Sequence, residues 1–155
     1  MVHLKILRES NILKNLSDAQ LEKLAAFAIS ESHPAGTLLY KEGDPANKFY
    51  LVEEGKVFLE MKTDMGPARP PLQVTIDVIT KGEGMGWSAF VEPNLYTLSG
   101  VCMDAAKLIS FESGKLRDLM DKDPELGYKL LKGINKLLAS RLSHTRILLV
   151  SERAL

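Results

Sequence analysis

The chain has 155 residues, of which 45% are hydrophobic and 26% are charged, a composition typical of one globular domain of ordinary size. Its 20 basic and 20 acidic residues leave no net charge, which disfavours a dedicated nucleic-acid-binding surface. The sequence contains no apolar run of about 18 residues and no signal-peptide pattern, and its single cysteine, Cys102, cannot form an internal disulfide. We therefore expect a cytoplasmic protein with no membrane association.

A first helix is predicted after the mixed segment that covers residues 4–16. Ser17 and Gln20 form a capping-box pattern, in which the serine hydroxyl accepts an N–H of the first turn and the glutamine side chain reaches back to the serine N–H. The apolar residues that follow have helical spacing. The helix should begin at Asp18 and end at about Phe27 or Ile29.

The periodicity changes after Pro34, where short β-rich runs alternate with turn residues. Because no helix separates these runs, they predict an antiparallel barrel or sandwich and exclude a doubly wound parallel sheet. The predicted strands are Thr37–Tyr40, Lys48–Glu53, Lys56–Lys62, Gln73–Ile79, Leu95–Val101 and Ala106–Glu112.

A glycine-rich turn precedes the fifth of these strands. Gly82, Gly84 and Gly86 allow positive φ angles and a close approach of the backbone, and the small residues that follow them can start a short helix. Such a turn presents backbone N–H groups to an anion, although a plain connection between strands would look the same. The turn is therefore a candidate phosphate site.

Helical spacing returns at Ser113 or Gly114, and Pro124 separates a short helix from a long one. From Glu125 onward, apolar residues recur at steps of three and four, so the helix extends beyond a small barrel and its far half needs a partner. A second copy of the chain is one solution, and fraying or folding back of the last ten residues is the other. The predicted dimer interface consists of Leu130, Ile134, Leu137, Leu138, Leu142 and Leu149.

In this order of elements the chain resembles the cyclic-nucleotide-binding domain, the sensory module of catabolite-activator-type regulators, protein kinase A regulatory subunits and gated channels. Pro34–Asp44 ends in the family's E-G-D turn, and Lys48–Val57 is similar to its next hairpin, with the structural glycine at Gly55. The resemblance implies an antiparallel β-roll of the jelly-roll (double-stranded β-helix) type with an N-terminal helix. It places residues 1–124 in the roll with its N-terminal and hinge helices, and residues 125–155 in a long C-terminal helix of the same domain, which serves dimerisation.

The family's phosphate-binding cassette reads F-G-E-x-A-L, followed by R-A-A, and Met85–Phe90 and Tyr96–Ser99 stand in their places. In the family the glutamate accepts the ribose 2′-hydroxyl and the arginine pairs with the cyclic phosphate. Here Trp87 replaces the glutamate and no arginine is present. Because losing a hydrogen bond to a charged group costs about 1.5–3 kcal/mol, we expect weak binding of cyclic AMP and cyclic GMP. The candidate ligand-binding residues are Gly84, Met85, Gly86, Trp87, Ser88, Ala89, Tyr96, Thr97, Leu98 and Ser99.

Two functions remain open. In the first, a small anionic ligand, a nucleotide or another phosphate-bearing molecule, binds to the backbone amides of the cassette and shifts the C-terminal helix, and a partner protein or a homodimer responds. In the second, Trp87 and Tyr96 fill the pocket, and the chain is a ligand-independent dimerisation or docking module on the same fold. No cofactor is expected beyond that ligand.

Other chemistry finds no support in the residue pattern. His3, His33 and His144 lie in separate elements without a metal-ligand spacing, and no nucleophile-elbow or paired-carboxylate pattern is present, so we expect neither a metal site nor catalysis. The basic residues of the last helix are interpreted as a solvated face. They are Lys129, Lys132, Lys136, Arg141 and Arg146. No helix-turn-helix follows that helix, so we expect no direct reading of DNA.

Overall fold

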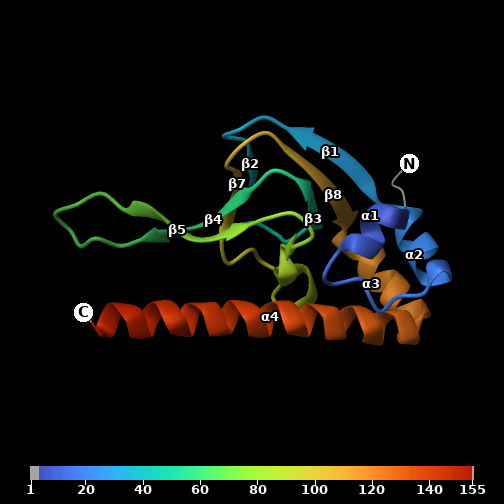
Figure 1. The fold of residues 1–155 in the computed structure, drawn as a ribbon. Coiled ribbons are helices and arrows are strands. Elements are labelled where there is room, and N and C mark those ends of the chain that lie inside the picture. The colour runs from blue at the N-terminus through green and yellow to red at the C-terminus, as the bar shows by residue number, and fades with distance from the viewer. Residues whose placement is uncertain (1–3, 155) are drawn as a thin grey trace.

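The computed structural model describes residues 4–154, so His3 and the outermost residues of both predicted segments lie outside it. Two four-stranded sheets form a β-roll, short helices cover its N-terminal end, and a long helix runs along one side (Figure 1). All strand pairs in both sheets are antiparallel. The predicted fold class, mainly β with an N-terminal helix and a long C-terminal helix, is confirmed.

The helices are α1 (Leu4–Glu9), α2 (Asp18–Ala25), α3 (Ser113–Lys122) and α4 (Pro124–Arg153). Helix α2 begins where the capping box predicts, because the Ser17 hydroxyl accepts the Gln20 N–H at 3.2 Å and the Gln20 side chain accepts the Ser17 N–H at 2.9 Å. It ends at Ala25, earlier than predicted, since Ile29–His33 forms a strand that the sequence analysis did not recognise.

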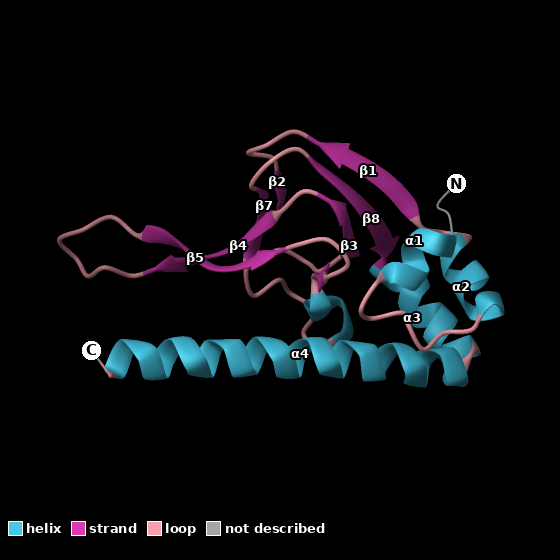
Figure 2. Cartoon of the chain, in the orientation of Figure 1, coloured by secondary structure: helices cyan, strands magenta, loops and turns pink. Residues whose placement is uncertain are grey.

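Eight strands among the described residues make up the roll. Figure 2 draws the strands in magenta. They are β1 (Ile29–His33), β2 (Leu38–Tyr40), β3 (Lys48–Glu54), β4 (Val57–Thr63), β5 (Leu72–Ile79), β6 (Gly84–Met85), β7 (Ser99–Cys102) and β8 (Ala106–Glu112). One sheet has the order β1-β8-β3-β6 and the other β2-β7-β4-β5. The strand predicted at Leu95–Val101 begins only at Ser99, because the preceding segment pairs with a turn: the Tyr96 N–H donates to the Asp44 carbonyl at 2.9 Å.

The core consists of two clusters separated by the β3–β8 sheet. Since side chains alternate between the faces of a strand, Ile109 and Phe111 of β8 contact the helices, whereas Leu108 points into the roll. The helix-side cluster includes Leu7, Leu21, Leu24, Phe49, Leu116, Leu126, Leu130 and Ile134. The interior of the roll is filled by Tyr40, Tyr50, Val57, Leu59, Ile79, Met85 and Tyr96.

Helix α4 has 30 residues and is therefore about 45 Å long. The Asp123 carboxylate accepts the Leu126 N–H at 3.1 Å, which caps the helix, and pairs with the Lys23 ammonium of α2 at 2.8 Å. The side chains of Leu130, Ile134 and Leu137 belong to the chain's own core, with at most 9% exposed. The predicted dimer interface is corrected accordingly: these three residues are not accessible to a partner. Leu138 is half-buried, and Leu142 and Leu149 are exposed.

Gly133 brings α4 against the segment between α1 and α2. A Cβ atom at this position would lie 2.2 Å from the Ile12 carbonyl oxygen. We therefore expect Gly133→Ala to lower the free energy of unfolding by about 1–3 kcal/mol, although alanine is the better helix former. Urea unfolding followed by circular dichroism measures the change. Gly114→Ala in α3 is the control, since its Cβ would meet no atom closer than 3.8 Å, and an equal loss in both variants would contradict the explanation.

Candidate functional site

The cassette begins with a tight turn against strand β3. Gly86 has a φ of 84°, in the left-handed region, and a Cβ atom there would lie 2.9 Å from the Lys48 carbonyl oxygen. Glycine is thus required for both the backbone conformation and the close packing. After the turn, Trp87–Phe90 forms one turn of 3₁₀ helix, η1, in which Ser88 and Ala89 are buried.

Tyr96, the first residue of the second half of the cassette, lines the cavity together with Gly86, Trp87 and Ser88 of the first half. Its ring stacks on Tyr40, with centroids 4.0 Å apart and planes at 17°, and Tyr40 stacks in turn on Tyr50. The Tyr96 hydroxyl donates to the Lys48 carbonyl oxygen at 2.7 Å and accepts the Lys48 N–H at 3.1 Å. Gly100 makes room for this stack, because a Cβ atom there would lie 2.8 Å from the Tyr40 ring. Burial raises the pKa of the Tyr96 phenol, so the ring is neutral at physiological pH.

Little space remains in the cassette. The cavity there measures about 10 Å³, which is room for one water molecule at most. It is lined by Tyr40, Leu59, Gly86, Trp87, Ser88, Tyr96, Thr97 and Leu98. Tyr40 and Tyr96 fill the site, whereas the sequence analysis considered Trp87 and Tyr96; the Trp87 side chain is half-buried at the edge of both core clusters.

The candidate ligand-binding residues do not all meet at this cavity. Gly84, Met85 and Ala89 are buried behind it, where a Cβ on Gly84 would lie 2.3 Å from the Ile12 side chain. Ser99 does not line this cavity. Its hydroxyl points away from it and accepts the Glu42 N–H at 2.9 Å. The structure therefore brings six of the ten candidates together: Gly86, Trp87, Ser88, Tyr96, Thr97 and Leu98.

Arg141 connects α4 to the segment that leads into the cassette. Its guanidinium pairs with the Asp77 carboxylate of β5 at 2.8 Å and with the Glu83 carboxylate, one residue before β6. The other Glu83 oxygen accepts the Thr80 N–H at 3.0 Å and the Thr80 hydroxyl at 2.7 Å. All three charged side chains are largely buried, with 14–26% exposed.

Sequence reasoning missed this role because it placed Arg141 on a solvated basic face. One signal was available: Leu130, Ile134, Leu137 and Arg141 follow one another at steps of three and four, which puts Arg141 on the buried stripe of α4. A charged residue on a buried stripe needs a partner of opposite charge.

Within residues 4–154, no three histidine, cysteine, aspartate or glutamate side chains are grouped closely enough to hold a metal ion. Over the same residues, no helix combines the length and the apolar character that crossing a membrane requires.

The sequence profile of the cyclic nucleotide-binding domain matches residues 30–123, which is more than half of the chain. The β-roll, the glycine-rich turn and the terminal helix described above are the features of this class, so the chain belongs to the cyclic nucleotide-binding domain family. This family is regulatory, and no catalytic domain is evident in the part of the chain that the structure describes.

Known relatives agree with this assignment. The chain is 26% identical over 131 residues to the cAMP-dependent protein kinase regulatory subunit of Schizosaccharomyces pombe, an alignment covering 80% of this chain and 30% of that protein. The chain spans less than a third of the length of the curated relatives it matches.

Solved structures share the fold. A cyclic nucleotide-binding domain from Methylobacillus flagellatus has a TM-score of 0.80 at 20% identity, with 96% of this chain and 81% of that one covered. A protein of Geobacter metallireducens has a TM-score of 0.78 at 23% identity, with 92% and 99% covered.

Proposed function

We propose that the chain is a non-catalytic regulatory module in which a small anionic, phosphate-bearing ligand acts at the cassette and α4 transmits the signal to a second copy of the chain or to a partner protein. Cyclic AMP and cyclic GMP are poor candidates for this ligand, because the cassette has no arginine to pair with the phosphate and no glutamate to bind the ribose. The cassette cavity, at about 10 Å³, is also too small for a nucleotide. A ligand that reaches Gly86 and Ser88 must therefore displace the Tyr96 ring.

The observation that carries this proposal is the position of Arg141. Glu83 is paired with Arg141 and lies within the glycine-rich turn, between Gly82 and Gly84, so a shift of the turn changes the geometry of an ion pair on α4. A ligand changes a conformational equilibrium only through contacts that differ between the two states. Glu83 and Arg141 are 58 residues apart in the sequence, and their ion pair joins the two elements directly in space.

The exposed side of α4 supports the version of the proposal in which the signal passes to a second copy of the chain. Tyr128, Leu131, Leu138, Leu142 and Leu149 lie on one stripe, with steps of three, seven, four and seven residues, which are the a and d positions of a heptad. The exposed fraction is between 42% and 63% for each of Tyr128, Leu131, Leu142 and Leu149. Asn135 takes one of the a positions, where asparagine favours a single register of a two-stranded coiled coil.

A ligand-independent docking module is the second candidate function. It is favoured by the stack of Tyr40 on Tyr96, which fills the cassette with the chain's own side chains. In that case α4 pairs with its partner regardless of the cassette.

Nuclear magnetic resonance on ¹⁵N-labelled protein separates the two candidates. Inorganic phosphate, AMP, cyclic AMP and cyclic GMP are titrated to about 1 mM, the concentration that corresponds to a binding free energy of about −4 kcal/mol. We expect at least one phosphate-bearing probe to shift the amide signals of residues 84–89 and the Nε–H signal of Arg141 with the same half-saturation. Cassette shifts without a change at Arg141 would contradict the signalling route. If no probe shifts either signal while a dimer is present, the ligand-independent function is supported instead.

A further inference from the structure

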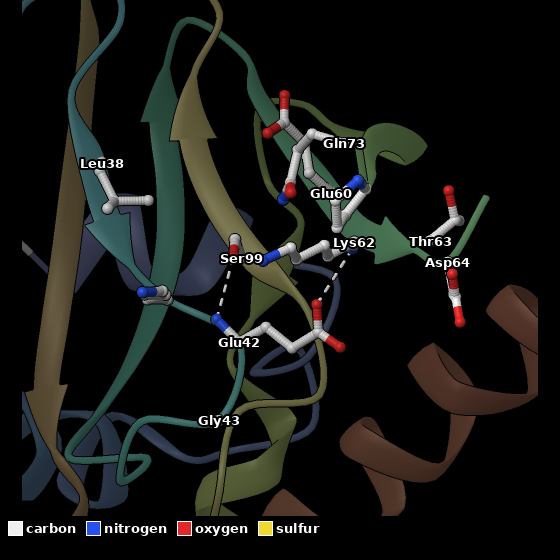
Figure 3. A pocket seen from close by; sticks show the side chains of 11 residues that line it. Leu38, Glu42, Gly43, Glu60, Lys62, Thr63, Asp64, Gln73 and Ser99 are labelled. Carbon is white, nitrogen blue, oxygen red and sulfur yellow. Dashed lines mark hydrogen bonds between the residues drawn. The ribbon is translucent and has the colours of Figure 1, made fainter. Parts of the chain in front are cut away.

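A large open cavity lies on the other side of β7 from the cassette cavity. It measures about 870 Å³ and shares no lining residue with the cassette cavity. Its walls come from three segments: the turn after β2, strands β4 and β5 with the base of their hairpin, and the start of β7 (Figure 3). Cavities of about 300–1,000 Å³ are the usual size for small-molecule sites.

The polar groups in this cavity carry both signs of charge. Lys41 and Lys62 contribute ammonium groups, and Glu42, Glu60 and Asp64 contribute carboxylates. Two of these carboxylates are already used by the fold: Glu42 accepts the Lys62 N–H at 3.1 Å, and Asp64 accepts the Gly66 N–H at 2.8 Å. In Figure 3 the Lys62 side chain reaches toward Ser99, between Glu42 on one side and Glu60 with Gln73 on the other.

Several of these groups remain available to a ligand. Among residues 4–154, no ion pair within 4.0 Å is made by the ammonium groups of Lys41 and Lys62 or by the Glu60 carboxylate. Leu38, of which 56% is exposed, and Pro71 add apolar surface to the lining. A purely anionic ligand would be repelled by three carboxylates, and a purely cationic one by two lysines. A ligand that carries one charge of each sign, separated by an apolar part, satisfies both sets of groups.

We infer that this cavity is a second binding site, distinct from the cassette cavity, for a small zwitterionic molecule of amino-acid or dipeptide size. The carboxylate of the ligand pairs with Lys41 and Lys62, its ammonium group with Glu60, and its apolar part contacts Leu38 and Pro71. These charged groups are on the surface, so each ion pair contributes modestly and the affinity is expected to be in the millimolar range.

The site is connected to the cassette through β7 and the turn after β2. Thr97 and Leu98 line the cassette cavity, whereas the next residue, Ser99, lines the second one. The Gly43 N–H donates to the Tyr96 carbonyl oxygen at 2.8 Å, so the wall of the second cavity is bonded to the residue that fills the cassette. A ligand at either site therefore contacts the segment 96–99.

Three matched dipeptides test the charge requirement. Leu-Leu carries both charges, N-acetyl-Leu-Leu only the negative one and Leu-Leu amide only the positive one. On ¹⁵N-labelled protein we expect Leu-Leu to cause saturable shifts of the amide signals of Lys41, Glu42, Lys62 and Ser99, and to bind about two- to five-fold more tightly than either capped form. Equal binding of all three peptides, shifts confined to residues 84–90, or no saturable shift would each overturn the inference.

Variants assign the two charges to their residues. Lys62→Gln should remove the preference for a free carboxylate over the amide, and Glu60→Gln should remove the preference for a free ammonium over the acetylated form. Lys56→Gln is the control, because Lys56 is exposed in the neighbouring hairpin and does not line the cavity. If the control lowers the affinity as much as Lys62→Gln, the inference is wrong, since the effect would then follow the net charge of the chain.

Discussion

Arg141→Met is expected to lower the free energy of unfolding by about 2–4 kcal/mol, because it leaves the largely buried carboxylates of Asp77 and Glu83 without a cation. The methionine retains most of the apolar stem, so the loss reports on charge and not on packing. Urea denaturation at constant pH measures the effect. For a chain of this length we expect the midpoint of thermal unfolding to fall by roughly 5–15 °C.

Two comparisons make this prediction specific. Arg146→Met removes an exposed guanidinium from the same helix and should change stability by less than about 0.5 kcal/mol. In the Arg141→Met background, adding Asp77→Asn or Glu83→Gln should restore part of the loss, since a neutral amide is easier to leave unpaired than a carboxylate. If the double variants are as unstable as the sum of the single ones, the ion pairs are not the cause.

Leu142→Asp is expected to convert the proposed dimer into a monomer without unfolding the chain. Leu142 lies in the middle of the exposed stripe, and 51% of its surface is exposed in the single chain. Burying a leucine side chain contributes about 1.5–3 kcal/mol. In a symmetric dimer the substitution is present in both copies, so its effect on the free energy of dimerisation doubles. The dissociation constant should therefore rise more than 100-fold. Light scattering after size exclusion, over a range of protein concentrations, measures the change.

Ser143→Asp provides the matched control for this variant. It adds the same charge one residue further along, about 100° around the helix and away from the stripe. Its dimer should persist. A wild-type chain that is monomeric at every concentration, or a Leu142→Asp variant that dimerises as the wild type does, would contradict the proposed interface.

Local patterns in the sequence predicted several elements because their causes are local. The Ser17 and Gln20 side chains bond to each other's backbone, which any chain with this pattern can do, and helix α2 begins where they require. Strand β1 was missed since its apolar content is low and its backbone is held by pairing with β8, about 75 residues later. Long-range pairing of this kind leaves little trace in a short window of sequence.

The cassette likewise contains a feature with a local cause, which the sequence predicted, and a feature that depends on long-range packing, which the sequence did not predict. Of the three glycines that could take a positive φ, Gly82 and Gly86 do and Gly84 does not, and a glycine-rich turn carries this conformational signal locally. Tyr40 was not identified as part of the site. It lies 56 residues before Tyr96, and only the roll, with Gly100 leaving space beside the ring, stacks the two aromatic side chains. Likewise, Leu130 and Leu142 belong to the same run of apolar residues on α4, and only the packing of the helix shows that Leu130 faces the core and Leu142 does not.

The length of α4 has a mechanical consequence. The helix is clamped at its first residues, where Asp123 holds both the helix cap and Lys23 of α2, and it leaves the core about halfway along. A rigid rod of about 45 Å that tilts by about 5° about this pivot moves its free tip by about 4 Å, but moves the backbone at Arg141 by only about 2 Å. In the proposed dimer, a displacement of the helix on the scale of one broken ion pair at Arg141 therefore corresponds to a movement at the tip that is wide enough to separate facing leucines.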